Sequence, residues 1–377
     1  MIRLPCQPRC MPPPRPRIKP ALRPLWRNGS TLQLGVDPAH AVVIGGLDPG
    51  SAKVLTSLDG TRDLPGVTAA AAALGVDAAR LDELFAVLTR AGVLEDGADE
   101  TRPLSGLSRV ERDRLGPDLA AASLLAGAGG SGVSTLERRR CAVVQVFGAG
   151  RVGSTIVSLL AAAGVGAVVV EDSGVTRDAD VTPAGPCPED VGSRRQDAAV
   201  RAARRAAPSM RSGLPMGRPL PDLAVLTAAH GADAPIAERM VRDGVPHLFA
   251  RVRETTGVIG PFVVPGRTSC LRCHDLHRTD RDPAWPSIVA QLSSGARDRP
   301  VACDVVLATA VAAHASLHVL SVIDGDLEPT SVDGTWEISP RDGGLRRRSW
   351  SVHPVCGCGW ASEPDTFAET EAEAVPR

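Results

Sequence analysis

The 377-residue sequence contains no tyrosine, few other aromatic residues and no excess of charge of either sign. Lysine and arginine total 42 against 43 aspartates and glutamates, so nothing in this balance would neutralise a nucleic-acid backbone or an anionic membrane surface. We therefore expect neither as the main partner. The lack of tyrosine, beside abundant alanine, glycine, proline and arginine, fits a GC-rich genome better than a functional constraint.

Long apolar runs are also missing. The first seventeen residues are rich in proline and arginine without an apolar core of signal-peptide length, and no later segment approaches about 18 uninterrupted apolar residues. A cytoplasmic protein is expected. In that reducing compartment the nine cysteines indicate metal ligands or reactive thiols rather than disulfides.

The length of the chain allows two domains. Four prolines between residues 12 and 16 fix the backbone and offer little to bury, which predicts a disordered leader over residues 1–17. Residues 18–96 are expected to form a small winged-helix-like α+β domain. Its elements are two β-type runs, Thr31–Leu34 and Ala41–Ile44, and helical stretches that begin near Ser51, Val67 and Ala78.

Residues 97–138 are predicted to hold a helix and a linker, since Leu107–Leu125 could form one helix and the run 127–132 is rich in glycine. Beyond it, residues 139–361 have the pattern of a doubly wound α/β domain, and residues 362–377 are expected to be a disordered tail. The predicted elements are strands at Cys141–Phe147, Ala167–Val170 and Leu223–Thr227, and helices at Val152–Ala163, about 234–241 and Asp304–Val322, the last with Asp304 as N-cap.

A glycine loop follows the first of these strands. In Gly148-Ala149-Gly150-Arg151-Val152-Gly153 the first glycine makes the turn, the second lets phosphate approach the backbone, and the third lets helix pack on strand. Asp172, at the end of the next strand, is placed to accept hydrogen bonds from ribose hydroxyls. A Rossmann-type fold is predicted. A scaffold kept for packing or peptide docking, without a bound phosphate, is the alternative.

Two close thiol pairs, Cys270 with Cys273 and Cys356 with Cys358, supply the four thiolates of a tetrahedral structural zinc site. Such a closed site has no open position for water, so it would stabilise the fold rather than hydrolyse a substrate. The alternative is a coincidence of buried cysteines.

Nearby histidines are further candidates. His274, His277 and His353 could replace a cysteine ligand, and His314 and His318 share a helix face at a spacing that metals use. For each of them an ordinary surface, core or hydrogen-bonded histidine is the favoured interpretation.

The order of these parts, over roughly residues 107–360, resembles the ThiF-type branch of the ubiquitin-like-modifier-activating enzymes. These adenylate the C-terminal carboxylate of a protein or peptide using MgATP, and usually pair as homodimers through the nucleotide domain. The resemblance implies ATP-contacting positions and, in sulfur-transfer members, a reactive cysteine. The positions are Gly148, Gly150, Gly153 and Asp172, with Arg195 in place of a lysine, and Cys303 as the cysteine.

Several charges of the active members are missing. The arginine of the helix before the nucleotide domain falls on Pro117, and a second acid after Asp172 falls on Gly174. An arginine–glutamine pair has no counterpart between residues 180 and 190. The aspartate that helps hold Mg²⁺ falls near Ala229-His230, with no carboxylate until Asp233. Because pyrophosphate departure needs cations and Mg²⁺, each loss can cost a few kcal/mol.

Remaining arginines offer partial compensation or are ordinary solvated charges. They are Arg151, Arg177, Arg194 and Arg195. Cys303 has a similarly plain alternative as a small residue at a helix start, although a helix N-terminus would favour its thiolate.

The N-terminal domain resembles the winged-helix leader-recognition domains fused to ThiF-like proteins in azoline-forming pathways. Such domains bind a peptide at an exposed strand edge, here Thr31–Leu34 and Ala41–Ile44; a packing role is the alternative. The expected function is therefore to bind and present a precursor peptide or small carrier protein to a partner enzyme, for example of cyclodehydratase type. An active adenylyltransferase or sulfur-relay enzyme that uses Cys303 is the second hypothesis.

Two other classes are weaker. A nicotinamide-dependent oxidoreductase would use the same glycine loop, but no recognisable catalytic pair accompanies it. A DNA-binding regulator would need a basic helix, whereas the stretch from Ala78 carries Arg80 and Arg90 against Asp82 and Glu83.

Overall fold

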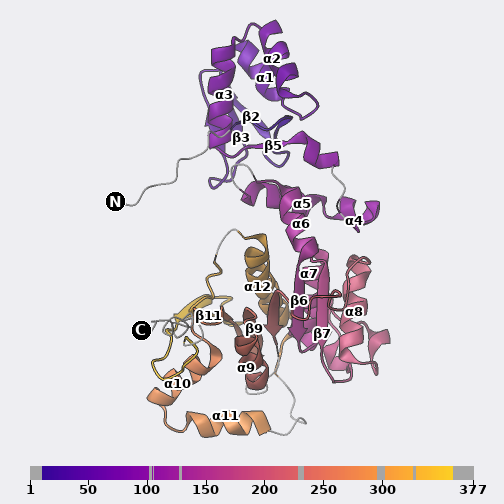
Figure 1. Cartoon of the computed structure of the whole chain (residues 1–377), viewed down its shortest axis with the longest axis vertical. Coiled ribbons are helices and arrows are strands. Elements are labelled where there is room, and N and C mark those ends of the chain that lie inside the picture. The colour runs from indigo at the N-terminus through magenta and orange to yellow at the C-terminus, as the bar shows by residue number, and fades with distance from the viewer. Residues whose placement is uncertain are drawn as a thin grey trace, which may run out of the picture. The chain divides into compact units, whose positions relative to one another are not determined.

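The computed structural model describes residues 11–101, 104, 106–126, 130–227, 233–294, 302–325 and 328–359. The chain divides into two compact units, Met1–Arg140 and Cys141–Arg377 (Figure 1). Residues 1–10 of the expected leader and 362–377 of the expected tail lie outside the described residues.

The N-terminal unit contains a three-stranded antiparallel sheet of β2 (Pro24–Asn28), β3 (Thr31–Leu34) and β4 (Val42–Ile44), in the order β2-β3-β4. The prediction that Thr31–Leu34 is an exposed edge is therefore wrong, because β3 is paired on both sides. A second sheet joins β1 (Pro16–Ile18) to β5 (Leu94–Asp96). Regular structure thus begins within the segment that was expected to be a disordered leader.

Three helices complete this unit and confirm the three predicted helical stretches: α1 (Pro49–Thr56), α2 (Leu64–Ala73) and α3 (Ala78–Arg90). Each begins after an aspartate whose carboxylate accepts a hydrogen bond from the backbone three residues on. The apolar stripe of α3 joins Leu32 and Leu34 in one core. The stripe consists of Leu81, Leu84, Phe85 and Leu88.

The segment before the nucleotide-type domain contains α4 (Arg109–Arg114), α5 (Gly116–Leu125) and α6 (Gly132–Cys141), after a short 3₁₀ turn η1 (Gly97–Thr101). The prediction of one continuous helix over 107–125 is wrong. Pro117 lacks an amide hydrogen and its ring clashes with the preceding turn, so α4 ends before it.

A buried lysine holds α5 within the N-terminal unit. The Lys19 amine donates a hydrogen bond to the Ser123 carbonyl, and the Ser123 hydroxyl donates to Glu95. Burial lowers the pKa of Lys19. Of the expected glycine-rich linker, residues 127–129 lie outside the described residues, and Gly132 already belongs to α6.

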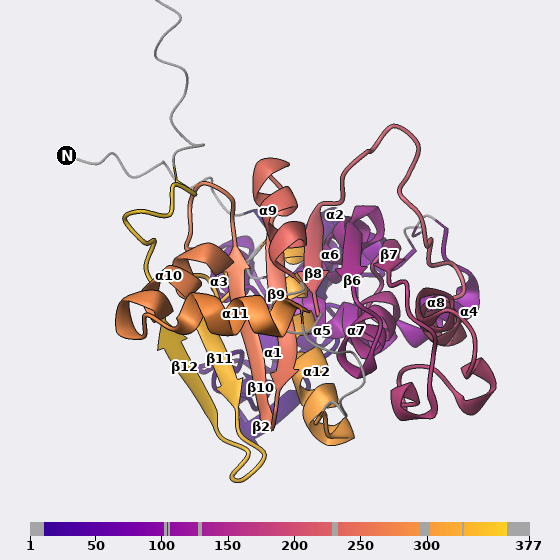
Figure 2. The same cartoon turned by 90° about the horizontal axis from the view of Figure 1, so that it is seen from below.

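The C-terminal unit is built on a seven-stranded sheet in the order β12-β11-β10-β9-β8-β6-β7 (Figure 2). Its first four strands in the chain pair in parallel and the last three antiparallel. The strands are β6 (Val143–Phe147), β7 (Ala167–Glu171), β8 (Leu223–Leu226), β9 (His247–Arg253), β10 (Thr256–Val263), β11 (Gly334–Ile338) and β12 (Leu345–Ser349). The predicted doubly wound α/β domain is confirmed.

Helices cover both faces of this sheet. One face packs against α7 (Arg151–Ala162), α8 (Arg195–Ala206) and α12 (Val305–Asp324), and the other against α9 (Ala234–Arg242) and α10 (Leu271–Arg281), which is followed by α11 (Trp285–Ser294). Asp304 caps α12 as predicted, accepting hydrogen bonds from two backbone amides. By length and composition α12 could cross a membrane, yet it packs as a core helix against α7, β9 and β10.

Candidate functional site

The glycine loop joins β6 to α7 with the geometry that the sequence predicts. Gly148 has φ of +91°, which favours glycine. A Cβ at Gly153 would lie 1.9 Å from the Gly148 carbonyl oxygen and 2.8 Å from Thr227 Oγ1, so the close packing of helix on loop requires a glycine there. A Cβ at Gly150 would meet nothing within 4 Å. The backbone at Gly150, just before the N-terminus of α7, is therefore open to a ligand.

Asp172 follows β7 and lies against this loop. Its Oδ2 accepts a hydrogen bond from the Ala149 amide at 2.7 Å, and its Oδ1 accepts one from the Gly174 amide at 2.7 Å. Each carboxylate oxygen retains further acceptor capacity. The acid that was expected to bind ribose thus also fixes the conformation of the glycine loop.

Arg195, at the start of α8, lies beside Asp172 but is paired elsewhere. Its Nε and Nη2 donate to the two carboxylate oxygens of Asp180, at 2.9 Å and 3.1 Å. Asp180 belongs to the 3₁₀ turn η2 (Asp178–Asp180) and is buried. A Cβ at Gly174 would lie 3.2 Å from Arg195 Nη1, which places this guanidinium next to the loop that Asp172 closes. Sequence reasoning missed Asp180, because a lone aspartate 15 residues away carries no signal.

Arg151 connects the glycine loop to the start of α12. Its Nη1 donates to the Cys303 carbonyl at 2.7 Å, and its Nε donates to the Ala179 carbonyl. Cys303 is therefore close to the loop. Burial raises the pKa of the Cys303 thiol, and Arg151 only partly opposes this. The role of Cys303 as a reactive cysteine stays a prediction.

The region of the missing Mg²⁺ ligand is partly described. Ala229 and His230 lie outside the described residues, whereas Asp233 precedes α9 and is fully buried. Its Oδ2 forms an ion pair with Arg251 Nη1 at 3.3 Å. The first carboxylate after β8 is thus engaged in the protein interior.

The four predicted thiols come together between α10 and the segment after β12. The Sγ–Sγ distances are 3.7 Å for Cys270–Cys273, 3.5 Å for Cys270–Cys356 and 3.4 Å for Cys273–Cys358. A tetrahedral zinc ion with Zn–S bonds of about 2.3 Å would hold its sulfur atoms about 3.8 Å apart. The cluster is therefore compatible with zinc, with all four sulfur atoms within 4.8 Å of one another.

Hydrogen bonds already favour one thiolate in this cluster. The Cys270 thiol donates to Cys273, which lowers the pKa of Cys273 to about 4 and raises the pKa of Cys270. The backbone amide of His353 also donates to Cys273. Because the thiolate is the form that binds metal, these contacts suit a metal site.

The neighbouring histidines have other partners. His274 is buried, stacks on Trp350 with ring centroids 4.3 Å apart, and approaches Ser269 Oγ at 3.3 Å. His353 Nε2 lies 2.9 Å from Asp280 Oδ2, and His277 Nε2 lies 3.0 Å from the Ser351 carbonyl.

The histidine pair on α12 also has a structural role. His318 Nδ1 lies 2.6 Å from the buried Ser331 hydroxyl. The His314 ring is 4.7 Å from that of His318. The packing interpretation therefore suits all five histidines.

No protein-family model and no curated protein matches the sequence. Solved structures do match over nearly the whole chain. E. coli MccB with ATP has a TM-score of 0.65 at 18% identity, covering 91% of this chain and 99% of that one. The microcin C7 biosynthetic enzyme MccB in complex with N-formylated MccA has a TM-score of 0.65 at 17% identity with the same coverage. PaaA matches with a TM-score of 0.66 at 16% identity, covering 88% of this chain and 99% of PaaA.

At such low identities these matches establish the fold. They confirm the fold that the resemblance to ThiF-type enzymes predicts, with its small N-terminal unit and four-cysteine cluster. The chain therefore has the fold of the microcin C7 biosynthetic enzyme MccB.

Proposed function

We propose that this protein is a ThiF-like protein that binds a precursor peptide or small carrier protein and presents it to a partner modifying enzyme. The observation that carries the proposal is the match over 91% of this chain and 99% of MccB, which includes both units. In one of those structures MccB is in complex with N-formylated MccA. A cyclodehydratase-type partner enzyme, a cytoplasmic location and a homodimer belong to the same proposal.

The peptide would add to the N-terminal sheet along β4. The sequence predicts that β3 and β4 form the binding edge. Because β3 is paired on both sides, only β4 of these two strands has an open edge. Val43 presents an apolar side chain that is 48% exposed. The Arg80 guanidinium donates to the Gly46 carbonyl at 2.9 Å and so holds the turn after β4 against α3. An open strand edge supplies main-chain hydrogen bonds, and exposed side chains beside it supply specificity.

The charges around the glycine loop favour presentation over adenylation. Gly174 occupies the position of the family's second acid, and Asp233 forms a buried ion pair with Arg251. Arg195 is neutralised by Asp180. Phosphoryl and adenylyl transfer depend on cations placed where negative charge develops. Arg195 and Asp233 instead form ion pairs within the protein.

Binding of synthetic peptides tests this proposal. Peptides translated from the short open reading frames beside the gene are labelled with fluorescein and titrated with the full-length protein. We expect one of them to bind, and Val43→Asp to weaken that binding at least tenfold. Val110→Asp is the matched control, since Val110 is 77% exposed on α4. Failure of every peptide and of small Gly-Gly-ending carriers to bind, together with ATP turnover, would contradict the proposal.

The second candidate is an active adenylyltransferase or sulfur-relay enzyme with Cys303 as acceptor. The preserved geometry at Gly148, Gly150 and Gly153 favours it, and ATP with Mg²⁺ would be its cofactors. ATP–pyrophosphate exchange measured with each binding peptide decides between the two. A Cys303→Ser variant that still catalyses ATP–pyrophosphate exchange but no longer accepts sulfur supports the sulfur-relay enzyme. The absence of exchange with every acceptor contradicts this alternative.

A further inference from the structure

The outer edge of β7 is only half covered. β7 is the last strand of the sheet and bonds to β6 through its odd-numbered residues, as the Ala167 amide to the Ala142 carbonyl illustrates. The even-numbered residues turn their backbone groups outward. Arg211 covers the first of these, since the Val168 amide donates to the Arg211 carbonyl at 2.9 Å. Among the described residues, none pairs with the Val170 amide, so the second half of the edge is open.

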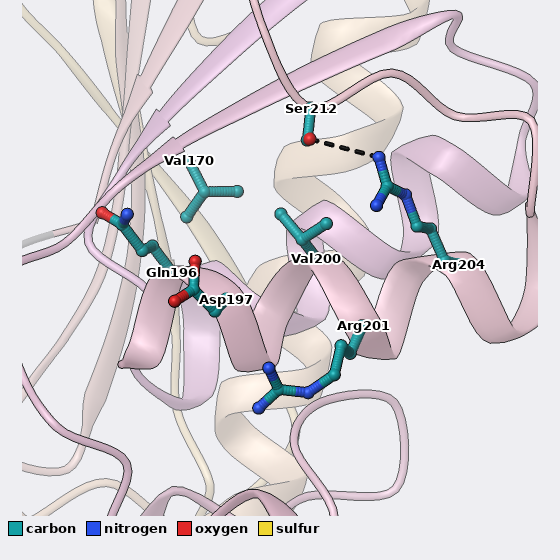
Figure 3. A pocket seen from close by; sticks show the side chains of 7 residues that line it. All are labelled: Val170, Gln196, Asp197, Val200, Arg201, Arg204 and Ser212. Atoms are coloured by element: carbon teal, nitrogen blue, oxygen red, sulfur yellow. Dashed lines mark hydrogen bonds between the residues drawn. The ribbon is translucent and has the colours of Figure 1, made fainter. Parts of the chain in front are cut away.

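A cleft lies directly beside this open half. It has a volume of about 300 Å³ and is formed by β7, α8 and the segment that follows Arg211 (Figure 3). Val170 and Val200 provide apolar surface, and Arg204 reaches across to the Ser212 hydroxyl at 3.2 Å. The remaining lining residues are Gln196, Asp197 and Arg201. Its mixed apolar and polar lining suits an extended chain whose side chains alternate.

One arginine that lines this cleft has no acidic partner among the described residues. Of the four arginines of α8, Arg195 is paired with Asp180. Arg201 is paired with Asp190 at 2.7 Å, but the contacts of Arg204 are the neutral Met210 carbonyl and the Ser212 hydroxyl. A carboxylate is a stronger, bidentate acceptor for a guanidinium than either. Arg204, whose contacts are neutral, therefore favours an acidic partner, whereas Asp197 at the other end of the cleft disfavours one (Figure 3).

We propose that the open edge of β7 and the arginine side of α8 dock an extended acidic peptide segment, which adds to the sheet beside β7. The segment accepts a hydrogen bond from the Val170 amide and continues the line begun by Arg211. One of its carboxylates replaces Ser212 as the acceptor of Arg204. This site is separate from the β4 edge and does not depend on the function proposed above.

The probe is a fluorescein-labelled peptide of four Glu-Val repeats, titrated into the full-length protein by fluorescence polarisation at low salt. We expect saturable binding that Arg204→Glu weakens at least tenfold and Arg204→Gln at least threefold. Arg242→Glu, an exposed arginine on α9, should change it less than twofold. Asp197→Asn should tighten binding, and Val43→Asp should leave it unchanged.

Two control peptides separate strand addition from simple charge attraction. The same peptide with an N-methyl group on every residue keeps its charge but loses its amide donors and cannot pair through either edge, so it should not bind. A Lys-Val repeat should not bind either. Equal binding of the N-methylated peptide, an unchanged affinity of Arg204→Glu, or no binding of the Glu-Val peptide to the wild type would overturn the proposal. Thermal melts of each variant verify that it is folded.

Discussion

Asp233 and Arg251 form an ion pair inside the C-terminal unit, with 3.3 Å between Oδ2 and Nη1 and side chains that are 0% and 8% exposed. Arg251 also lies over the Phe249 ring, 5.4 Å from its centroid. Burial lowers the pKa of Arg251, and Asp233 opposes that shift. Since both charges are desolvated, removing one partner leaves the other uncompensated in the interior. The pair links the start of α9 to β9 and is structural.

Replacing one partner should therefore destabilise the protein strongly. We expect Arg251→Met and Asp233→Asn each to lower the free energy of unfolding by about 3–5 kcal/mol, and the double variant to recover part of the loss. Urea denaturation followed by circular dichroism measures these values. Arg239→Met, which removes a 3.9 Å pair to the exposed Glu171, is the control and should cost less than about 1 kcal/mol. An Asp233→Asn variant of wild-type stability would show that this carboxylate is available for another role.

The thiol cluster predicts one tightly bound zinc ion per chain. Cys273→Ser or Cys356→Ser should abolish stoichiometric zinc and unfold the region of α10, because structural zinc contributes about 10 kcal/mol or more to such sites. Metal analysis by mass spectrometry and thermal unfolding with and without a chelator measure both effects. Cys303→Ser is the matched control and should retain the metal. Protein that contains no zinc and resists chelation would remove the zinc site and the contribution assigned to it.

Alanine substitutions at two glycines of the loop should have different effects on stability. Gly153→Ala would place a methyl group 1.9 Å from the Gly148 carbonyl oxygen, so α7 must move, and we expect a loss of about 3 kcal/mol or more. Gly150→Ala meets nothing within 4 Å and has φ of −71°, so its stability should stay within about 1 kcal/mol of wild type. If nucleotide binds, Gly150→Ala should nevertheless weaken it, because phosphate must approach that backbone. Calorimetric titration with ATP, beside thermal melts, separates the two effects.

The sequence predicted best those features whose determinants are local. The cap at Asp304, the helix that begins at Ala78 and the glycine loop each depend on a few neighbouring residues. The cysteine cluster was also predictable, because each pair of thiols is close in the sequence and a single long-range contact brings the two pairs together. Strand β2 was missed since Pro24–Asn28 lacks alternating apolar residues and is mostly exposed, and this omission made β3 look like an edge.

Long-range pairing escaped sequence reasoning. The bond from Lys19 to Ser123 spans 104 residues, and nothing near either residue indicates it. The same holds for Asp233 with Arg251 and for Asp180 with Arg195, where a charge that suggests ligand binding is neutralised within the fold. The division of 107–125 into α4 and α5 was within reach, because Pro117 is visible in the sequence.

Acid should destabilise the C-terminal unit through His247. This residue begins β9 and is fully buried, and its Nδ1 lies 3.0 Å from the Val245 carbonyl, while Nε2 has no partner among the described residues. Burial lowers the pKa of His247 to about 4 from its ordinary value of 6.5. The unfolded chain therefore takes up a proton at a higher pH than the folded one, so stability is fully present above about pH 6.5 and is lost as the pH falls towards about 4.

For this one group the loss between pH 7.5 and pH 5.0 should be about 2 kcal/mol. His247→Asn can still donate to the Val245 carbonyl but does not titrate, so its unfolding free energy should fall by about 2 kcal/mol less than that of the wild type over the same range. Urea denaturation at the two pH values measures the difference. His40→Asn, a partly exposed histidine of the N-terminal unit, is the control. Parallel pH profiles for wild type and His247→Asn would show that His247 is not the group through which acid acts, and would direct attention to His318, whose pKa burial also lowers to about 4.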